Sequence, residues 1–122
     1  MKILIVDDSK TILLMVSEML KKLGHEPLTA IHGQDAFDVV SKNTDIDIIL
    51  LDWNMPVMTG IEFLVKNKNE KIFDIPIMMM TTEKAPDKIK MALENGAVDY
   101  IMKPFTPDVL NSKIEMLKDF MD

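Results

Sequence analysis

The sequence contains no cysteine and no arginine among its 122 residues. Without cysteine, neither a disulfide framework nor a thiolate metal site can form, and the composition suits a reducing compartment such as the cytoplasm. All 14 basic residues are lysines and the formal net charge is −6, so no basic stripe is present to displace counterions from a nucleic acid. We therefore expect a cytoplasmic protein without direct nucleic-acid binding, in which any phosphoryl chemistry relies on lysine and metal.

Long apolar runs are also missing. The stretch from Met1 to Asp7 holds only five apolar residues, too few for the core of a signal peptide or for a membrane span. We therefore expect no membrane binding. No linker-like stretch divides the 122 residues, so the sequence predicts one domain. A chain of this length buries roughly two-thirds of its unfolded surface and needs no cross-links to fold.

Strand-like and helix-like segments alternate five times along the chain. The expected strands are Lys2–Asp7, Leu28–Ala30, Ile46–Leu51, Ile75–Met80 and Val98–Met102. The expected helices are 12–23 (capped by Ser9 or Thr11 and closed by Gly24), Gln34–Ser41, one from the Thr59–Glu62 capping box to about Lys66, one between Pro86 and Gly96, and one after Thr106-Pro107. Five such units predict an α/β fold, a doubly wound parallel sheet with helices on both faces.

Apolar spacing also predicts which side chains the helices bury. On the first helix these are Ile12, Met15, Val16, Met19, Leu20 and Leu23, and on the second Ala36, Phe37 and Val40. On the last helix they are Val109, Leu110, Ile114, Leu117 and Met121. The 12 methionines, including Met78–Met80, are interpreted as core filling rather than as a binding surface.

The stretch from Ile48 to Pro56 organises the rest of the chain. Four apolar residues run directly into Asp52, a pattern typical of a strand that is buried on both faces of a parallel sheet. Asp52 is then at the carboxyl end of the strand, where open α/β sheets place their ligand sites. On this stretch alone it can be a nucleophile, a metal ligand or the cap of the next element.

The other strands also end in polar residues. If the sheet is parallel, one edge receives the following side chains: Asp7, Asp8, Asp52, Thr81 and Lys103. Carboxylates about 5 Å apart repel by roughly 3 kcal/mol per pair at an effective dielectric near 20, so such a cluster calls for a divalent cation or a retained proton. Oxygen ligands suit Mg²⁺, and a hydroxyl and an ammonium suit phosphoryl oxygens. The set predicts phosphoryl transfer onto Asp52, which forms an acyl phosphate as the nucleophile.

Three further residues receive weaker interpretations. His25 and His32 have no partner at metal-ligand spacing, so we assign them no metal or phosphohistidine role. Trp53 directly follows Asp52 and can belong either to the core or to the wall of the site. The sequence leaves both alternatives open.

Taken together, these motifs resemble the receiver domains of two-component response regulators, and most closely the stand-alone regulators of chemotaxis. The resemblance covers the whole chain and is carried by Asp7-Asp8, Asp52-Trp53-Asn54-Met55-Pro56 with Gly60, Thr81, and Lys103-Pro104-Phe105. It implies a flavodoxin-like fold with five strands in the order 2-1-3-4-5 and five helices. It also implies that residues 1–122 form a single receiver domain without an output domain.

The resemblance also implies the role of each residue at the site. Asp52 corresponds to the phospho-accepting aspartate. Asp8, Asp52 and the backbone carbonyl of Asn54 correspond to direct Mg²⁺ ligands, with Asp7 acting mainly through water and Mn²⁺ as a possible substitute. Such a receiver is not an enzyme in the usual sense, although it catalyses its own phosphorylation and dephosphorylation.

Four other positions carry implied roles in the family. Thr81 corresponds to the hydroxyl that moves toward the phosphoryl group, and Lys103, before a cis peptide bond to Pro104, pairs with the phosphate. Tyr100 corresponds to the aromatic switch that turns inward after the threonine moves. Glu83, together with Asn54, bears on the rate of self-dephosphorylation.

The implied partners are a sensor histidine kinase of the CheA-like kind, a flagellar motor switch protein or another protein target, and a possible phosphatase. The chain itself is expected to be monomeric. The expected partner surface covers the fourth helix, the fifth strand and the fifth helix, and its residues are Ile89, Val98, Tyr100 and Lys113.

Alternative functions remain at this point. Within the receiver interpretation, the chain can be a phosphorelay intermediate or act on an output protein in another pathway. A haloacid-dehalogenase-type phosphatase also forms an aspartyl phosphate, but it needs a second aspartate where Asn54 stands. A flavodoxin-like FMN carrier shares the topology, but Asp7-Asp8 would repel a bare phosphate.

Overall fold

Five strands and five helices alternate along the chain; the structure, a computed structural model, describes residues 1–121, with the backbone alone at residues 120 and 121. The strands are β1 (Lys2–Val6), β2 (Glu26–Ala30), β3 (Ile48–Asp52), β4 (Ile77–Thr81) and β5 (Ala97–Met102). The helices are α1 (Lys10–Lys22), α2 (Gly33–Lys42), α3 (Gly60–Glu70), α4 (Pro86–Glu94) and α5 (Pro107–Met121). In residues 1–121, no helix is long and apolar enough to cross a membrane.

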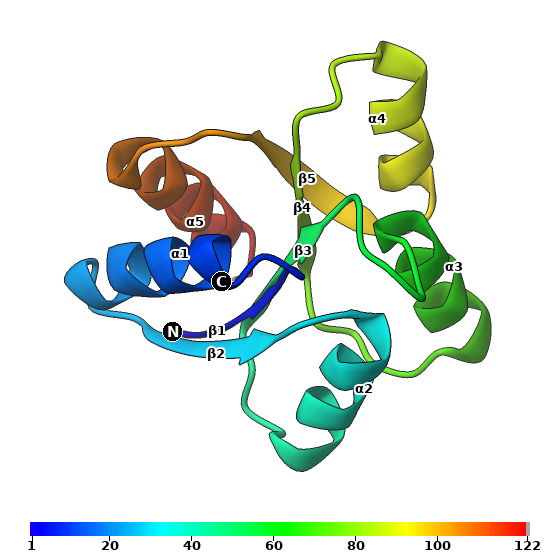
Figure 1. The fold of residues 1–122 in the computed structure, drawn as a ribbon, viewed down its shortest axis with the longest axis horizontal. Coiled ribbons are helices and arrows are strands. Elements are labelled where there is room, and N and C mark those ends of the chain that lie inside the picture. Colours follow the sequence, from blue (N-terminus) through cyan, green and yellow to red (C-terminus); the bar gives the residue numbers. More distant parts are fainter. Residues whose placement is uncertain (122) are drawn as a thin grey trace.

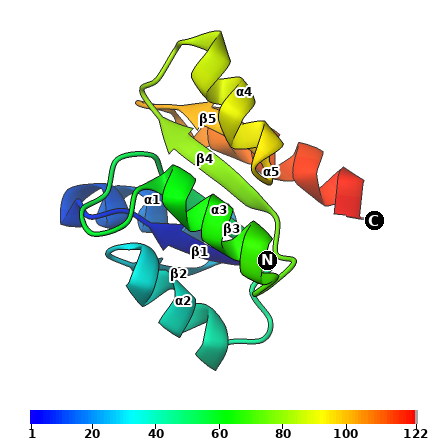
Figure 2. The same cartoon turned by 90° about the vertical axis from the view of Figure 1, so that its right-hand side faces the viewer.

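The strands form one parallel sheet in the order β2-β1-β3-β4-β5. Figure 1 shows α1 and α5 on one side of the sheet and α2, α3 and α4 on the other, and Figure 2 shows α3 lying across the sheet. The predicted fold class and strand order are confirmed. Because all strands run the same way, the residues after β1, β3, β4 and β5 come to one edge.

The central strands are buried on both faces, which explains their continuous apolar sequences. Along β1, Leu4 packs toward α2 and α3 while Ile3 and Ile5 pack toward α1 and α5. Met79 belongs to the first of these two clusters, and its neighbours along β4 belong to the second. These methionines are fully buried, as predicted, because their unbranched side chains fill irregular space between strand and helix.

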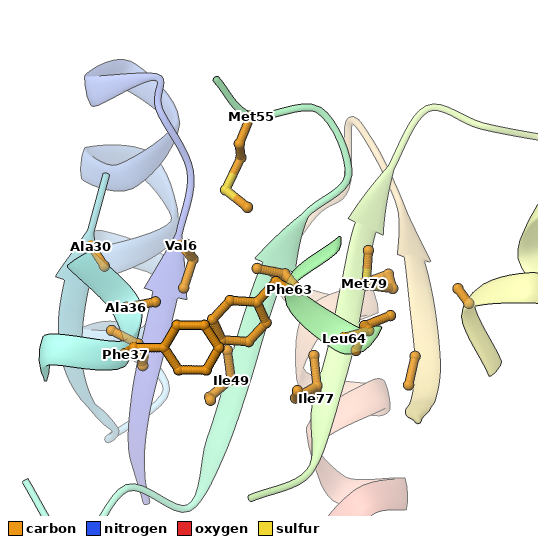
Figure 3. Packing of buried hydrophobic residues seen from close by; sticks show 14 of the residues in the cluster. Val6, Ala30, Ala36, Phe37, Ile49, Met55, Phe63, Leu64, Ile77 and Met79 are labelled. Atoms are coloured by element: carbon orange, nitrogen blue, oxygen red, sulfur yellow. The ribbon is translucent and has the colours of Figure 1, made fainter. Parts of the chain in front are cut away.

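Aromatic packing fixes α2 and α3 against the sheet. The rings of Phe37 and Phe63 stack with centroids 4.4 Å apart, and Phe73 lies 6.0 Å from Phe63 in a tilted arrangement. Figure 3 shows the Phe37–Phe63 pair over the β1 and β3 side chains Val6 and Ile49. This packing sets the position of α3, which begins next to the carboxyl end of β3.

Two predicted inward residues point outward instead. On α1 the buried face is centred on Leu13, Ser17 and Leu20, so Met15 lies on its flank and is 47% exposed. On α5, Leu110, Ile114 and Leu117 face the sheet, and Val109 is 45% exposed. Apolar spacing identified Val16 and Leu20 on the α1 face but missed Leu13 and Ser17. The prediction for Met121 concerns a side chain outside the described residues.

Exposed methionines also correct the general interpretation of this residue type. Met91 is 40% exposed and Met116 58% exposed, so not every methionine fills the core. Both lie on helices, where an unbranched side chain is tolerated at the surface as well as in the interior.

Several boundaries differ from the predicted ones. The strand β2 begins at Glu26 and contains Pro27, which is tolerated because β2 is an edge strand that pairs only with β1. Helix α3 continues four residues past Lys66 to Glu70, and Lys71 follows as a left-handed C-cap with φ of 51°. Strands β3 and β4 begin later than predicted and end on Asp52 and Thr81, which places both side chains at the sheet edge.

Candidate functional site

A cleft of about 280 Å³ opens at the carboxyl ends of the strands. Every residue predicted for the phosphoryl and metal site lines it, namely Asp7, Asp8, Asp52, Asn54, Thr81 and Lys103. The structure therefore brings together side chains that are up to 96 positions apart in sequence. Parallel topology is the cause, since each strand delivers its last residues to the same edge.

Lys103 connects two buried carboxylates in this cleft. Its Nζ donates to Asp52 Oδ1 at 2.7 Å and to Asp7 Oδ2 at 3.0 Å. Asp7 and Asp52 are 1% and 6% exposed, so their charges are largely removed from water. The single positive charge of Lys103 therefore faces two negative charges, so the cluster of these three side chains carries a net negative charge.

The pKa values of the pair follow from this imbalance. Burial raises the pKa of Asp52 above its ordinary value, and this effect outweighs the hydrogen bond from Lys103. Burial alone would lower the pKa of Lys103, but its contacts with Asp52 and Asp7 raise it. A further positive charge in the cleft would therefore favour the ionised form of Asp52.

Three carboxylates are arranged to hold such a charge. One oxygen each from Asp7, Asp8 and Asp52 lies within 4.8 Å of the other two. Asp8 is exposed at the mouth of the cleft, while Asp7 accepts hydrogen bonds from Ser9 N and Lys103 Nζ. The all-oxygen donor set fits a hard divalent cation such as Mg²⁺. Both oxygens of Asp7 already accept a hydrogen bond, and its implied action through water stays a prediction.

The loop after Asp52 forms the next part of the wall. Trp53 lines the cleft and also packs against the core cluster under α2 and α3, so both sequence alternatives hold for it. Asn54 is exposed in the cleft. Gly60 N donates to Trp53 O at 3.0 Å, and a Cβ atom on Gly60 would lie 2.6 Å from Asp52 O. Glycine is required here because the α3 backbone approaches the backbone that carries Asp52.

Thr81 is buried at the end of β4 with its hydroxyl oxygen already bonded. Its Oγ1 accepts a hydrogen bond from Glu83 N at 2.7 Å, which forms a tight side-chain turn. Glu83 does not line the cleft: its Oε1 accepts from Ala85 N at 3.0 Å, and its Oε2 lies 3.6 Å from Lys88 Nζ. The peptide bond between Lys103 and Pro104 is cis, as the resemblance implied.

The predicted partner surface is only partly exposed. Val98 is 49% exposed, whereas Ile89, Tyr100 and Lys113 are half-buried. Lys113 Nζ lies 5.2 Å from the centroid of the Tyr100 ring and 3.1 Å from both carboxylate oxygens of Asp99. Tyr100 and Lys113 are thus brought together. Their roles in partner binding stay predictions.

Sequence reasoning missed two residues in these contacts. Asp99 holds Lys113, and its position directly before Tyr100 in an edge strand was the available signal. Lys88 holds Glu83, and the signal there was the five-residue spacing across the start of α4. Both pairings depend on the relative orientation of neighbouring elements, which apolar periodicity does not predict.

Comparison with known proteins agrees with this geometry. Residues 3–115 match the family model of the response regulator receiver domain. The chain is 45% identical over 117 residues to a chemotaxis protein CheY homolog of Campylobacter jejuni, covering 94% of this chain and 90% of that protein. It is 41% identical over 119 residues to chemotaxis protein CheY1 of Helicobacter pylori, covering 96% of each.

A solved structure shows the same fold. The chemotaxis protein CheY4 of Vibrio cholerae superposes with a TM-score of 0.86 at 39% identity, covering 94% of this chain and 96% of that one. The family match, the sequence identities and the fold agree, and the similarity covers 90% or more of each of the three chemotaxis proteins named here. The chain therefore belongs to the response regulator receiver domain family.

Proposed function

We propose that this protein is a phospho-accepting response regulator of a two-component system that acts in chemotaxis, as a single receiver domain over residues 1–122. One observation carries the proposal: Lys103 links Asp52 and Asp7 beside Asp8 in one cleft at the strand ends. The names of the relatives support chemotaxis as the pathway. The family match favours this function over the phosphatase and the FMN carrier.

The chemistry assigns one task to each side chain. A carboxylate oxygen of Asp52 attacks the phosphorus of a phosphohistidine on the kinase, so a P–O bond forms while the P–N bond breaks and the histidine nitrogen leaves. Asp8, Asp52 and the backbone carbonyl of Asn54, with Asp7 acting through water, would hold Mg²⁺ or Mn²⁺, which would supply charge neutralisation. Lys103 pairs with the phosphoryl oxygens, and the Thr81 hydroxyl donates to one of them.

The signal then has to leave the cleft. Movement of Thr81 lets Tyr100 turn inward and changes the surface of α4, β5 and α5, where Ile89, Val98 and Lys113 contact the partner. A CheA-like sensor histidine kinase supplies the phosphoryl group in the cytoplasm, and a flagellar motor switch protein receives the signal. Asn54 and Glu83 set the rate of self-dephosphorylation, with a phosphatase as a further partner of the monomer.

A groove beside the cleft favours one second candidate, the phosphorelay intermediate. An apolar groove of about 260 Å³ lies between α1 and the segment after β5, lined by Met15, Met19 and Phe105 among others. It shares Lys103 and Thr82 with the cleft, so a phosphotransfer partner seated there would approach the site from α1.

Fluorescence of Trp53 tests the site itself. Trp53 is the single tryptophan and lines the cleft, so its emission should change on binding of Mg²⁺ and again on binding of beryllofluoride, a phosphoryl mimic. Asp8→Ala should abolish the Mg²⁺ response, whereas the matched control Asp47→Ala, outside the cleft, should keep it. An unchanged Mg²⁺ response in Asp8→Ala would remove the metal assignment.

Capture from the native lysate, with and without beryllofluoride, tests the output. A motor switch protein retained by the mimic-bound form, and lost in Val98→Glu but kept in Met15→Glu, supports the proposed function. The phosphorelay candidate would replace it if the unmodified protein retained a histidine phosphotransfer protein and only Met15→Glu lost that protein. Thr81→Ala should lower the gain in affinity on activation, which is typically about 1–3 kcal/mol for such coupling.

A further inference from the structure

The loop between β4 and α4 joins the Thr81 hydroxyl to the first turn of α4 through three consecutive contacts. Glu83 N donates to Thr81 Oγ1 at 2.7 Å, and Ala85 N donates to Glu83 Oε1 at 3.0 Å. The third contact is the ion pair of Lys88 Nζ with Glu83 Oε2 at 3.6 Å. We call this set the β4–α4 latch.

The latch supplies a side-chain contact at the start of α4. Ala85 is the N-cap residue of α4 and provides no side-chain hydrogen bond, and Pro86 follows at the first helical position. The carboxylate of Glu83 therefore satisfies the amide that a cap would leave open. The hydrogen bond from Ala85, with the charge of Lys88 as a smaller cause, lowers the pKa of Glu83 below its ordinary value, so the carboxylate is ionised at neutral pH.

These contacts oppose the movement that the proposed function requires. In the proposed function the Thr81 side chain moves toward a phosphoryl oxygen on Asp52, and the Glu83 amide that donates to Thr81 Oγ1 resists this movement. Any shift of the loop with Thr81 also disturbs the contacts of Glu83 with Ala85 and Lys88. A contact made in the resting form and lost in the active form stabilises the resting form.

We propose that Lys88 is a positioning residue that acts through Glu83 to hold Thr81 in its resting arrangement and so sets how readily the receiver is activated. This inference rests on the proposed function, because the latch matters only if Thr81 moves on activation. It assigns to Glu83 a role at the start of α4 in addition to dephosphorylation. Lys88 is outside the cleft, so a change there alters the latch without altering the phosphoryl or metal contacts.

The expected effect is small because the pair is near the surface. The side chains of Lys88 and Glu83 are 52% and 28% exposed, and ion pairs of this kind change equilibria by about 1.5- to fivefold. Removal of the pair raises the population of the active form, so an activating ligand should bind more tightly by the same factor.

Three variants isolate the latch. Lys88→Gln removes the ion pair, Lys88→Arg keeps it, and Lys90→Gln removes a comparable exposed pair, Lys90 with Glu94, from the same helix. The affinity of each Mg²⁺-loaded protein for beryllofluoride is measured by Trp53 fluorescence. Lys88→Gln should bind about 1.5- to fivefold more tightly than the unmodified protein, and the other two variants should match it. Equal affinity in Lys88→Gln and Lys90→Gln would overturn the proposal.

A second readout does not depend on phosphoryl chemistry. Hydrogen exchange at the Ala85 amide, followed by NMR in the metal-free protein, should be faster in Lys88→Gln than in Lys90→Gln and restored in Lys88→Arg. Identical exchange in all three overturns the latch even where beryllofluoride binds normally. Failure of the unmodified protein to bind beryllofluoride overturns the proposed function instead, while faster Ala85 exchange in Lys88→Gln would still support the contact network.

Discussion

The ammonium of Lys103 lies 2.7 Å from a carboxylate oxygen of Asp52, although the strands that precede these residues are separated by β4 in the sheet. The same ammonium also donates to an oxygen of Asp7, which follows β1, at 3.0 Å. The lysine side chain therefore spans the edge of the sheet and neutralises part of the charge on the acidic cluster. We therefore expect the metal-free protein to depend on this contact more than the metal-loaded protein does.

Substitution of Lys103 should show this dependence directly. Lys103→Met leaves two buried carboxylates without their cation, so the free energy of unfolding in EDTA should fall by about 3 kcal/mol. Excess Mg²⁺ should recover most of the loss, because the metal supplies the missing charge. Urea unfolding with and without Mg²⁺ measures both values. An equal loss in the two conditions would contradict the charge argument.

Replacement of Gly60 should disturb the site through the backbone. The Cβ atom of Gly60→Ala would meet the backbone oxygen of Asp52 at 2.6 Å, so we expect a loss of about 2 kcal/mol in stability. Mg²⁺ binding should weaken as well. Gly33→Ala is the matched control, since its Cβ meets only the movable Met58 side chain at 2.8 Å. Urea unfolding should show a clearly smaller loss in the control.

Val57 should limit stability in the loop after Asp52. It is a β-branched residue with φ of 69° and is 85% exposed, so it has a strained backbone without compensating burial. Val57→Gly should therefore raise the free energy of unfolding by about 1 kcal/mol. Val109→Gly, at an exposed position within α5, should lower it. A decrease in Val57→Gly comparable to that in Val109→Gly would show that the loop is not strained.

The pH dependence of stability should include a contribution from His25. Burial, together with the nearby Met1 ammonium, lowers the pKa of His25 below its ordinary value of 6.5. The folded state then binds fewer protons than the unfolded state, so this contribution is complete above pH 6.5 and is lost as the pH falls through the lowered pKa. Between about pH 7.5 and about pH 5.5, His25→Gln should lose less stability in urea than the unmodified protein. Parallel curves would exclude the contribution.

The sequence was sufficient to predict the fold and the polar residues that line the cleft, for a physical reason. A strand buried on both faces leaves a continuous apolar signal, and a polar residue that ends it, such as Asp52 or Thr81, is conspicuous. Parallel topology then brings those ends together without further information. The capping choice between Ser9 and Thr11 needed the structure, in which Ser9 accepts from Ile12 N.

Side-chain direction and tertiary pairing were less accessible. Met15 and Val109 have the apolar spacing of buried residues, but the neighbours that cover each helix decide its buried face. The contacts of Lys88 with Glu83 and of Lys113 with Asp99 depend on turns between elements. Such pairs carry no periodic signal, and they lie where the resting and active surfaces are expected to differ.

Mass spectrometry of the intact protein after incubation with acetyl phosphate tests the central claim most directly. Transfer breaks the bond between phosphorus and the acetate oxygen and forms one to an Asp52 oxygen, so acetate leaves and one phosphate is added to the chain. With Mg²⁺ the unmodified protein should gain one phosphate, and neither Asp52→Asn nor the unmodified protein in EDTA should gain any. A phosphate on Asp52→Asn, or none on the unmodified protein with Mg²⁺, would contradict the assignment of Asp52 as the phospho-acceptor.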